Sequence, residues 1–469
     1  MPTGVLTPVP RLRVWTNLLA SAPGALLYTY RSGTTTPSPV YADALEAAAL
    51  PNPVVADSGG LFPAIYLASG ISYRFTLTQS DGTAIWGPVD NVTAGPGTAG
   101  IFNVLDYGAA GTGTTDDTAA IQAAITAAVA AGNSEVYLPG GTYKLSSAIT
   151  VAFPITLRGA GPGLTSPTVL RIDSVAAHGI VVSTGGVHLR ELKVTSATGA
   201  RTGAGIHYTN GAGVPSALTT NVAVTGHSIG FWNEGSANEF FHCVANTNTA
   251  DGFRFDGQTN AQNEVGAYFC QANGNTAHGF AVGTAGLGIR LVSCTAASNG
   301  GFGILAQATN TGGIGDLWIT APEISSNVSG GISLIKCTQV IITGGLCELS
   351  TIGPNITITA PTNAVQITGM QVNSAATASG HGILCDGVDI GIANCLFFNN
   401  IGSAIVHGTN AARVTLANNL ARGNAVGVRF DGGTSLAIVG GNYLLNTAVS
   451  SGGVPAASRI SAAIGFADA

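Results

Sequence analysis

Beyond residue 170, hydrophobic residues follow a short repeat. Each unit has a polar or small residue, a glycine and a large apolar residue, as at 178–180, 251–253 and 381–383. The central positions recur at steps of 22–30 residues, with one step of 51 that holds a degenerate unit near Gly353. β-rich units with this period predict an all-β fold, a parallel β-solenoid in which each unit forms one coil. We place this solenoid at residues 161–450.

The pattern between residues 99 and 160 is different. Ile121, Ile125 and Val129 lie on one face of a helical run that starts at 118 and ends before Gly132. Asp116 and Asp117 stand at its start, where capping side chains and the helix dipole favour carboxylates. Strand-like segments follow. We interpret 99–160 as a linker, a capping helix for the exposed first coil, and the first strands.

The first 98 residues carry short apolar runs separated by turn signals. Runs at 25–30, 64–67 and 72–77 are bounded by Ser-Gly and Asp-Gly turns. This spacing predicts a small antiparallel β domain at 1–98 that ends in a linker at 93–98. Residues 451–469, beyond the last clear unit, are expected to form a C-terminal tail.

Composition narrows the possible functions. Only 9% of the residues are charged and the net charge is −6, with no basic stripe, so nucleic-acid binding is not expected. No run reaches about 18 apolar residues, so membrane insertion is not expected. The apolar stretch within residues 1–30 is interrupted by Trp15 and Pro23, which favours mature protein over a signal peptide.

The cysteines and histidines do not suggest a cofactor. The seven cysteines all lie beyond residue 240, and Cys243, Cys270 and Cys395 each precede a repeat centre by nine residues. Asn221 and Asn418 take this place in other coils, and the common register predicts a column of buried thiols and amides inside the solenoid. Neither the cysteines nor the eight histidines have metal-ligand spacing, so we expect no metal and no cofactor.

Three segments within residues 99–160 resemble a known family. They are Val-Leu-Asp-Tyr-Gly-Ala at 104–109, Thr-Asp-Asp-Thr-Ala-Ala-Ile-Gln at 115–122, and Val-Tyr-Leu-Pro-Gly-Gly-Thr-Tyr at 136–143. They are similar to the opening of pectate-lyase-like right-handed β-helix proteins, which are common among bacteriophage tailspikes and depolymerases. Segments at 27–33, 40–43, 52–60 and 62–67 resemble the virion-attachment domain of phage tailspikes.

The resemblance implies a right-handed parallel β-helix. It also implies a homotrimer located in the virion, on the phage tail. Residues 1–98 would attach to phage tail or portal-adaptor proteins. The β-helix would bind, and in many members cleave, host surface polysaccharide or lipopolysaccharide. The resemblance transfers no active site, because catalytic residues differ between members.

Candidate catalytic residues come from the local density of acids. Glycoside hydrolysis needs two carboxyl groups, and the acid-poor repeat gathers Glu234, Glu239, Asp256 and Glu264 within 31 residues. Trp232 and Arg254 lie in the same coils. Alternation along the strand points Trp232 away from the core, so we predict that it and Arg254 bind substrate.

Structural roles compete with this assignment. Glu234 and Asp256 share a coil position with Asp386 and Asp431, and each of the four precedes a glycine, which is typical of a turn. Most phenylalanines in these coils are expected in the core. The Gly-His-Gly at 380–382 matches a polygalacturonase motif, but it coincides with the repeat centre, where His178 and His278 also precede glycine.

The sequence therefore favours a phage tailspike that recognises and cleaves host polysaccharide, as an endoglycosidase or a polysaccharide lyase. A receptor-binding spike without catalysis is the alternative. A secreted lyase or hydrolase of cellular origin fits less well, because the N-terminal region resembles an attachment domain.

Overall fold

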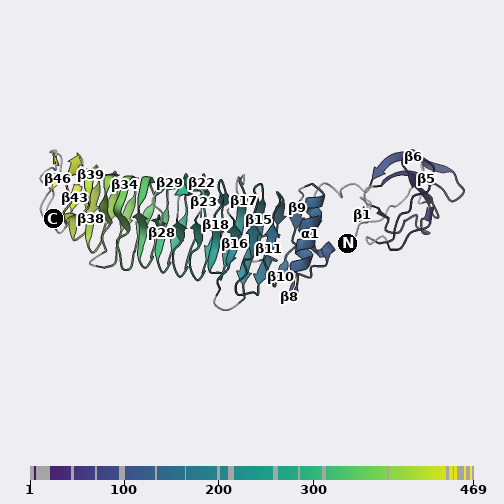
Figure 1. Ribbon diagram of the computed structural model, residues 1–469, viewed down its shortest axis with the longest axis horizontal. Coiled ribbons are helices and arrows are strands. Elements are labelled where there is room, and N and C mark those ends of the chain that lie inside the picture. Colours follow the sequence, from purple (N-terminus) through teal and green to yellow (C-terminus); the bar gives the residue numbers. More distant parts are fainter. Residues whose placement is uncertain are drawn as a thin grey trace. The chain divides into compact units, whose positions relative to one another are not determined.

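The computed structural model in Figure 1 forms two compact units, residues 1–101 and 102–469. It describes residues 5–6, 22–43, 47–68, 71–93, 101–132, 135–163, 165–197, 201–209, 216–256, 262–283, 286–308, 313–377, 380–439, 443–446, 448–451, 459–460 and 465–466. Residues 94–98 of the expected linker lie outside the described residues. No helix in the described segments is long and apolar enough to cross a membrane.

The first unit is a small antiparallel β structure, as the sequence predicts. Its four-stranded sheet has the order β3-β2-β5-β6, and a separate pair joins β1 and β4. The alternation in β5 buries Tyr73 and Leu77 in a common core with Leu27 and Phe62. The strands are β1 (Val5–Leu6), β2 (Leu26–Arg31), β3 (Val54–Val55), β4 (Tyr66–Leu67), β5 (Ser72–Thr78) and β6 (Ala84–Thr93).

The predicted capping helix lies near the start of the second unit. Helix α1 (Thr118–Ala130) buries Ile121 and Ile125 and packs on the first strands of the solenoid. Asp116 accepts hydrogen bonds from the backbone N–H and the hydroxyl of Thr118. Asp117 occupies the N-cap position but makes no capping bond, because its carboxylate accepts from Ala110 and the residue after it in the preceding loop.

The remaining strands form a parallel solenoid of about 11 turns. Three faces, named A, B and C, follow one another in every coil. Four long strands bend at a corner and serve two faces: β15 (His188–Ser196) and β17 (Leu218–Thr225) run from B to C, and β34 (Ile356–Thr368) and β36 (Ile383–Ala393) run from A to B.

Each face is a ladder of strands in register from coil to coil. Face A contains β11 (Ile149–Val151), β14 (Ile180–Val182), β16 (Ala204–Tyr208), β18 (Ile229–Asn233), β21 (Phe253–Phe255), β24 (Phe280–Val282), β28 (Phe302–Gln307), β31 (Gly330–Ile335), β38 (Ser403–His407), β41 (Val426–Phe430) and β44 (Ala448–Ser451). Face B contains β7 (Ile101–Asn103), β9 (Glu135–Tyr137), β12 (Thr156–Arg158), β19 (Glu239–Phe241), β23 (Gly266–Tyr268), β26 (Ile289–Val292), β29 (Ile314–Thr320), β32 (Cys337–Thr343), β39 (Ala412–Ala417), β42 (Leu436–Val439) and β45 (Arg459–Ile460).

Face C contains β8 (Thr112–Asp116), β10 (Gly141–Leu145), β13 (Thr168–Ile172), β20 (Val244–Asn246), β27 (Thr295–Ala297), β30 (Glu323–Ser325), β33 (Leu346–Glu348), β35 (Gln371–Asn373), β37 (Leu396–Phe398), β40 (Leu420–Arg422), β43 (Tyr443–Leu445) and β46 (Gly465–Phe466). A further pair, β22 (Gln262–Asn263) and β25 (Gly286–Leu287), lies between faces A and B. The turn η2 (Val104–Tyr107) precedes β8. Strands β45 and β46 pair with the preceding coil, so the solenoid pattern extends into the expected tail.

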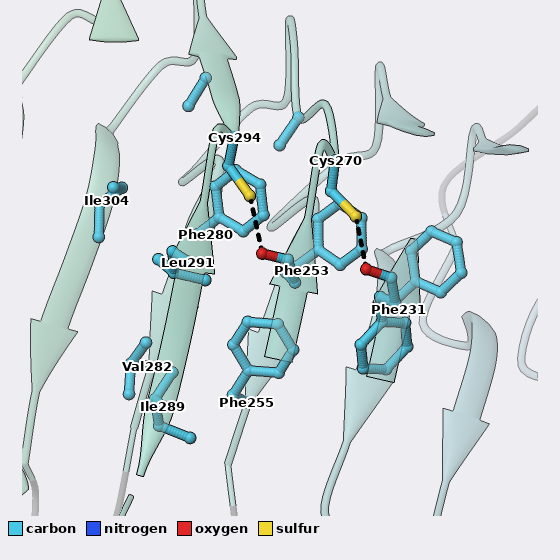
Figure 2. Packing of buried hydrophobic residues seen from close by; sticks show 14 of the residues in the cluster. Phe231, Phe253, Phe255, Cys270, Phe280, Val282, Ile289, Leu291, Cys294 and Ile304 are labelled. Atoms are coloured by element: carbon cyan, nitrogen blue, oxygen red, sulfur yellow. Dashed lines mark hydrogen bonds between the residues drawn. The ribbon is translucent and has the colours of Figure 1, made fainter. Parts of the chain in front are cut away.

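Side chains at equivalent positions of successive coils stack in columns inside the solenoid (Figure 2). Phe231, Phe253 and Phe280 stack with ring centroids 4.7 and 4.9 Å apart. Beside them, Cys270 and Cys294 are buried and donate hydrogen bonds to backbone carbonyl oxygens of the preceding coil. This confirms the thiols of the predicted column. The two predicted amides are wrong, because Asn221 is only partly buried and Asn418 is exposed, and the register puts Val222 and Asn419 at the equivalent positions instead. All seven cysteines are free and buried.

A second column, not predicted from the sequence, lines the corner between faces C and A. Asn248, Asn275, Asn299 and Asn327 are buried, and successive side-chain amides are joined by hydrogen bonds of 2.8–3.0 Å. Each amide also donates or accepts a bond with the backbone of a neighbouring coil. The ladder satisfies buried polar groups that the turn would otherwise leave unpaired.

Candidate functional site

Two of the predicted carboxylates are neighbours on face A. Glu234 follows β18 and Asp256 follows β21, and the register pairs Asn233 with Phe255, so the acids occupy equivalent positions on adjacent coils. Parallel strands place such positions about 4.8 Å apart. A Cβ at Gly283, the equivalent position in the next coil, would lie 2.7 Å from Oδ1 of Asp256. The glycine therefore leaves room for this carboxylate.

Glu234 is held by a histidine of the preceding coil. Nε2 of His207 lies 3.0 Å from Oε2 of Glu234, and only about a tenth of each side chain is exposed. The His207 ring stacks on Trp232 with a centroid distance of 4.3 Å, and His178 lies 4.7 Å away on another side. Burial and the neighbouring His207 lower the pKa of His178. The packing therefore restrains the imidazole that contacts Glu234.

Trp232 points outward, opposite to Phe231, as its strand position predicts. One face of its indole is covered by His207, and its Nε1 is buried with no hydrogen-bond partner among the described residues. The ring is therefore not a free platform for a sugar on that side. In this arrangement it orients His207.

Arg254 is also anchored. Its guanidinium pairs with Asp251 at 2.6 Å, and Asp251 is 2% exposed. The other oxygen of Asp251 accepts a hydrogen bond from the backbone N–H of His278. An open pocket of about 240 Å³ is lined by Arg254, Asp256, His278 and Gln307, together with Asp251. A carboxylate and a guanidinium thus share one open hollow on face A.

Glu239 and Glu264 lie across the corner between faces A and B. Glu239 begins β19, and Glu264 precedes β23 in the next coil. Glu264 is 64% exposed and pairs with Arg290 at 2.9 Å. Arg290 also lies over the Trp318 ring, 5.2 Å from its centroid. The four predicted acids therefore lie on either side of one corner in two adjacent coils, and of these only Glu234 and Asp256 occupy equivalent positions.

The competing residues have structural partners. Asp386 accepts from the backbone and side-chain amides of Asn410, and Asp431 pairs with Arg429. Nδ1 of His381 accepts from the backbone N–H of Ser403. The Gly-His-Gly at 380–382 thus supplies an acceptor between coils.

Sequence reasoning missed His207 and Asp251 as members of the site. His207 is one of eight scattered histidines, and only the stacking of coils brings it to Glu234 over 27 residues. Asp251 directly precedes a repeat glycine, as His178 and His278 do, and this shared position was its signal in the sequence. In the described part of the chain, no group of three or more metal-ligating side chains is gathered that could hold a metal ion.

Comparison with known proteins finds a family match near the start of the β-helix. Residues 101–185 match the family model of rhamnogalacturonase A/epimerase, pectate lyase-like proteins. Mannuronan C5-epimerase AlgE3 of Azotobacter vinelandii is 52% identical over 71 residues, which are 14% of this chain and 4% of that protein. The chain therefore matches only a small part of this relative's length.

Two solved structures extend the likeness over most of the chain. The A-module of mannuronan C-5 epimerase AlgE4 from Azotobacter vinelandii has a TM-score of 0.58 and 20% identity, covering 76% of this chain and 99% of the module. Tailspike protein 3 of bacteriophage CBA120 has a TM-score of 0.56 and 13% identity, covering 79% of this chain and 62% of that chain. The chain therefore has the pectate-lyase-like right-handed β-helix fold, whose structural neighbours here include a phage tailspike and a polysaccharide-modifying epimerase module.

Proposed function

We propose that this protein is a phage tailspike whose β-helix binds and cleaves host surface polysaccharide. The observation that carries the proposal is the pair Glu234 and Asp256, stacked on adjacent coils of an outward face beside His207 and Arg254. Two adjacent carboxyl groups are what a glycoside hydrolase requires. Tailspikes and polysaccharide-modifying enzymes among the structural neighbours support the same class.

The two carboxyl groups take different roles in this proposal. A coil spacing of about 4.8 Å is nearer to the separation of about 5–5.5 Å in retaining glycosidases than to the 6.5–9.5 Å of inverting ones. Glu234, sheltered and hydrogen-bonded to His207, protonates the glycosidic oxygen. Asp256, in the open pocket, attacks the anomeric carbon as the glycosidic C–O bond breaks and the protonated sugar leaves, and Arg254 binds a substituent of the sugar. Water, deprotonated by Glu234, then hydrolyses the glycosyl ester of Asp256 and restores both carboxyl groups. Glu239 and Glu264 then contact the glycan from the far side of the corner.

Two further steps are the attachment of the chain to the virion and its assembly into a trimer. Residues 1–98 bind phage tail or portal-adaptor proteins, and three chains associate through the β-helix. Association would cover part of the weakly charged surface. The protein then acts from the virion at the host cell surface.

Single variants test the carboxyl pair. Glu234→Gln and Asp256→Asn should each lower turnover of a cleaved glycan at least a hundredfold while leaving binding intact. Asp431→Asn is the matched control, because Asp431 occupies the same coil position far from the site. Undiminished turnover in both site variants would remove Glu234 and Asp256 from the mechanism. An ultraviolet-absorbing unsaturated product would identify a lyase instead of a hydrolase.

A further inference from the structure

A second open pocket lies on other coils than the carboxylate pair. It has a volume of about 570 Å³ and opens on face C, at the corner toward face A, where three adjacent coils contribute. It shares no residue with the pocket on face A. Its lining residues are Asn373, Ser374, Phe398, Asn399, Arg422 and Gly423.

A cation and an aromatic ring form one wall. Phe398 and Arg422 are register partners in β37 and β40, and the guanidinium carbon lies 5.0 Å from the ring centroid. Arg422 is exposed, whereas Arg413, in the same coil on face B, is paired with Asp389. Within the described segments, the guanidinium of Arg422 has no carboxylate partner. The pocket thus offers an uncompensated positive charge above an apolar surface.

Amide and hydroxyl groups form the rest of the wall. Asn373, the partner of Phe398 in β35, is 8% exposed, and its side-chain oxygen accepts no hydrogen bond within the described structure. Asn399 is exposed at the corner with a φ of 53°, and a Cβ at Gly423 would collide with its side-chain oxygen. Glycine at 423 therefore keeps space for this amide beside the pocket, and Ser374 adds a hydroxyl.

We propose that this pocket binds an acidic sugar residue of a polysaccharide. The planar guanidinium of Arg422 matches a sugar carboxylate, Phe398 matches the apolar face of the pyranose ring, and the polar groups of Asn373, Asn399 and Ser374 match its hydroxyls. Glu348 is the register partner of Asn373 in the preceding coil, and its negative charge repels the carboxylate of the sugar. The sugar carboxylate is therefore bound at the Arg422 end of the pocket. The inference rests on the proposed function for its glycan and deepens it by naming acidic glycan as the class.

Saturation-transfer NMR on the full chain tests this site with two probes, a galacturonate tetramer and a neutral glucose tetramer. The uronate should receive saturation through its ring protons and the neutral tetramer much less. Arg422→Met keeps the contact with Phe398 but removes the charge, and should weaken uronate binding about tenfold. Phe398→Ala should reduce the ring-proton signal. Arg413→Met, an exposed arginine of the same coil, should have no effect.

Equal binding of both probes, or unchanged uronate binding in Arg422→Met and Phe398→Ala, would overturn the proposal. Glu234→Gln separates this result from the proposed function. Loss of turnover in Glu234→Gln with retained uronate binding supports both sites. Uronate binding that responds to Glu234→Gln but not to Arg422→Met would place the acidic sugar on face A and refute the pocket on face C.

Discussion

His207 and Glu234 are 27 residues apart in the chain, yet Nε2 of the histidine lies 3.0 Å from Oε2 of the glutamate. The contact exists because β16 and β18 are register partners on successive coils. It places an imidazole behind a carboxyl group that faces outward beside Asp256. In the proposed mechanism, His207 is a positioning residue that fixes the orientation of Glu234.

Replacing His207 should therefore lower kcat much more than it changes KM. His207→Gln retains a hydrogen-bond donor but loses the imidazole that stacks on Trp232, so Glu234 is no longer held in one orientation. We expect kcat to fall about ten- to a hundredfold with little change in KM. Steady-state kinetics of glycan cleavage measure both constants, and equal kcat values in wild type and variant would contradict the positioning role.

Gly283→Ala should impair the function of Asp256 although it replaces no reactive side chain. The added Cβ would lie 2.7 Å from Oδ1 of Asp256, so the carboxylate must shift. We expect at least a tenfold loss of turnover with little change in the melting temperature. Gly163→Ala is the control, since nothing lies within 4 Å of a Cβ there. Equal turnover in both variants would show that the position of Asp256 is unimportant.

Acid should destabilise the β-helix through its histidines. Nδ1 of His178, His278 and His381 each accepts a backbone N–H of the next coil, which requires an unprotonated nitrogen. Burial lowers the pKa of His381 to about 4. The unfolded chain, with a histidine pKa near 6.5, therefore binds more protons between these values.

Stability is thus complete above about pH 6.5 and falls as pH drops toward 4, by at most about 1.4 kcal/mol per pH unit for each such histidine. His381→Asn keeps an acceptor that does not titrate, so its urea-unfolding midpoint should depend less on pH in this window. An identical pH dependence in wild type and variant would refute the mechanism. Below this window, Asp116, whose pKa is held at about 2 by hydrogen bonds from Ser146 and Thr118, adds a further loss.

The asparagine ladder should be a main source of stability. Asn299→Ala removes the side chain that binds Asn275 and Asn327, and leaves buried groups unpaired on both neighbouring coils. Each unpaired buried group costs about 1–3 kcal/mol, so we expect a loss of about 3 kcal/mol in the free energy of unfolding. Denaturant unfolding measures it. Asn410→Ala, an exposed position, should cost less than about 0.5 kcal/mol, and similar losses in both variants would contradict this role.

The repeat made much of the fold predictable. Because equivalent residues of a solenoid stack, the spacing from the repeat glycine was enough to place Glu234 over Asp256 and the thiols in one column. The same spacing carried the asparagine ladder, since Asn248, Asn275 and Asn327 each stand four residues before a repeat glycine. That signal was present in the sequence and not used.

Other features depend on packing that one-dimensional spacing does not contain. The tilt of His207 toward Glu234, the commitment of Arg254 to Asp251 and the covered face of Trp232 arise from side-chain conformations between coils. Glu239 and Glu264 were close in sequence to the face A pair, but the turn between faces placed them across a corner.

The most direct test of the central claim is to size surface glycans after incubation with the purified protein. Capsule and lipopolysaccharide from a panel of candidate hosts would be compared with and without the double variant Glu234→Gln/Asp256→Asn. The account predicts discrete oligosaccharides from at least one glycan with the wild-type protein and intact polymer with the variant. A glycan that binds the protein but is never shortened, or that both proteins shorten equally, would contradict it.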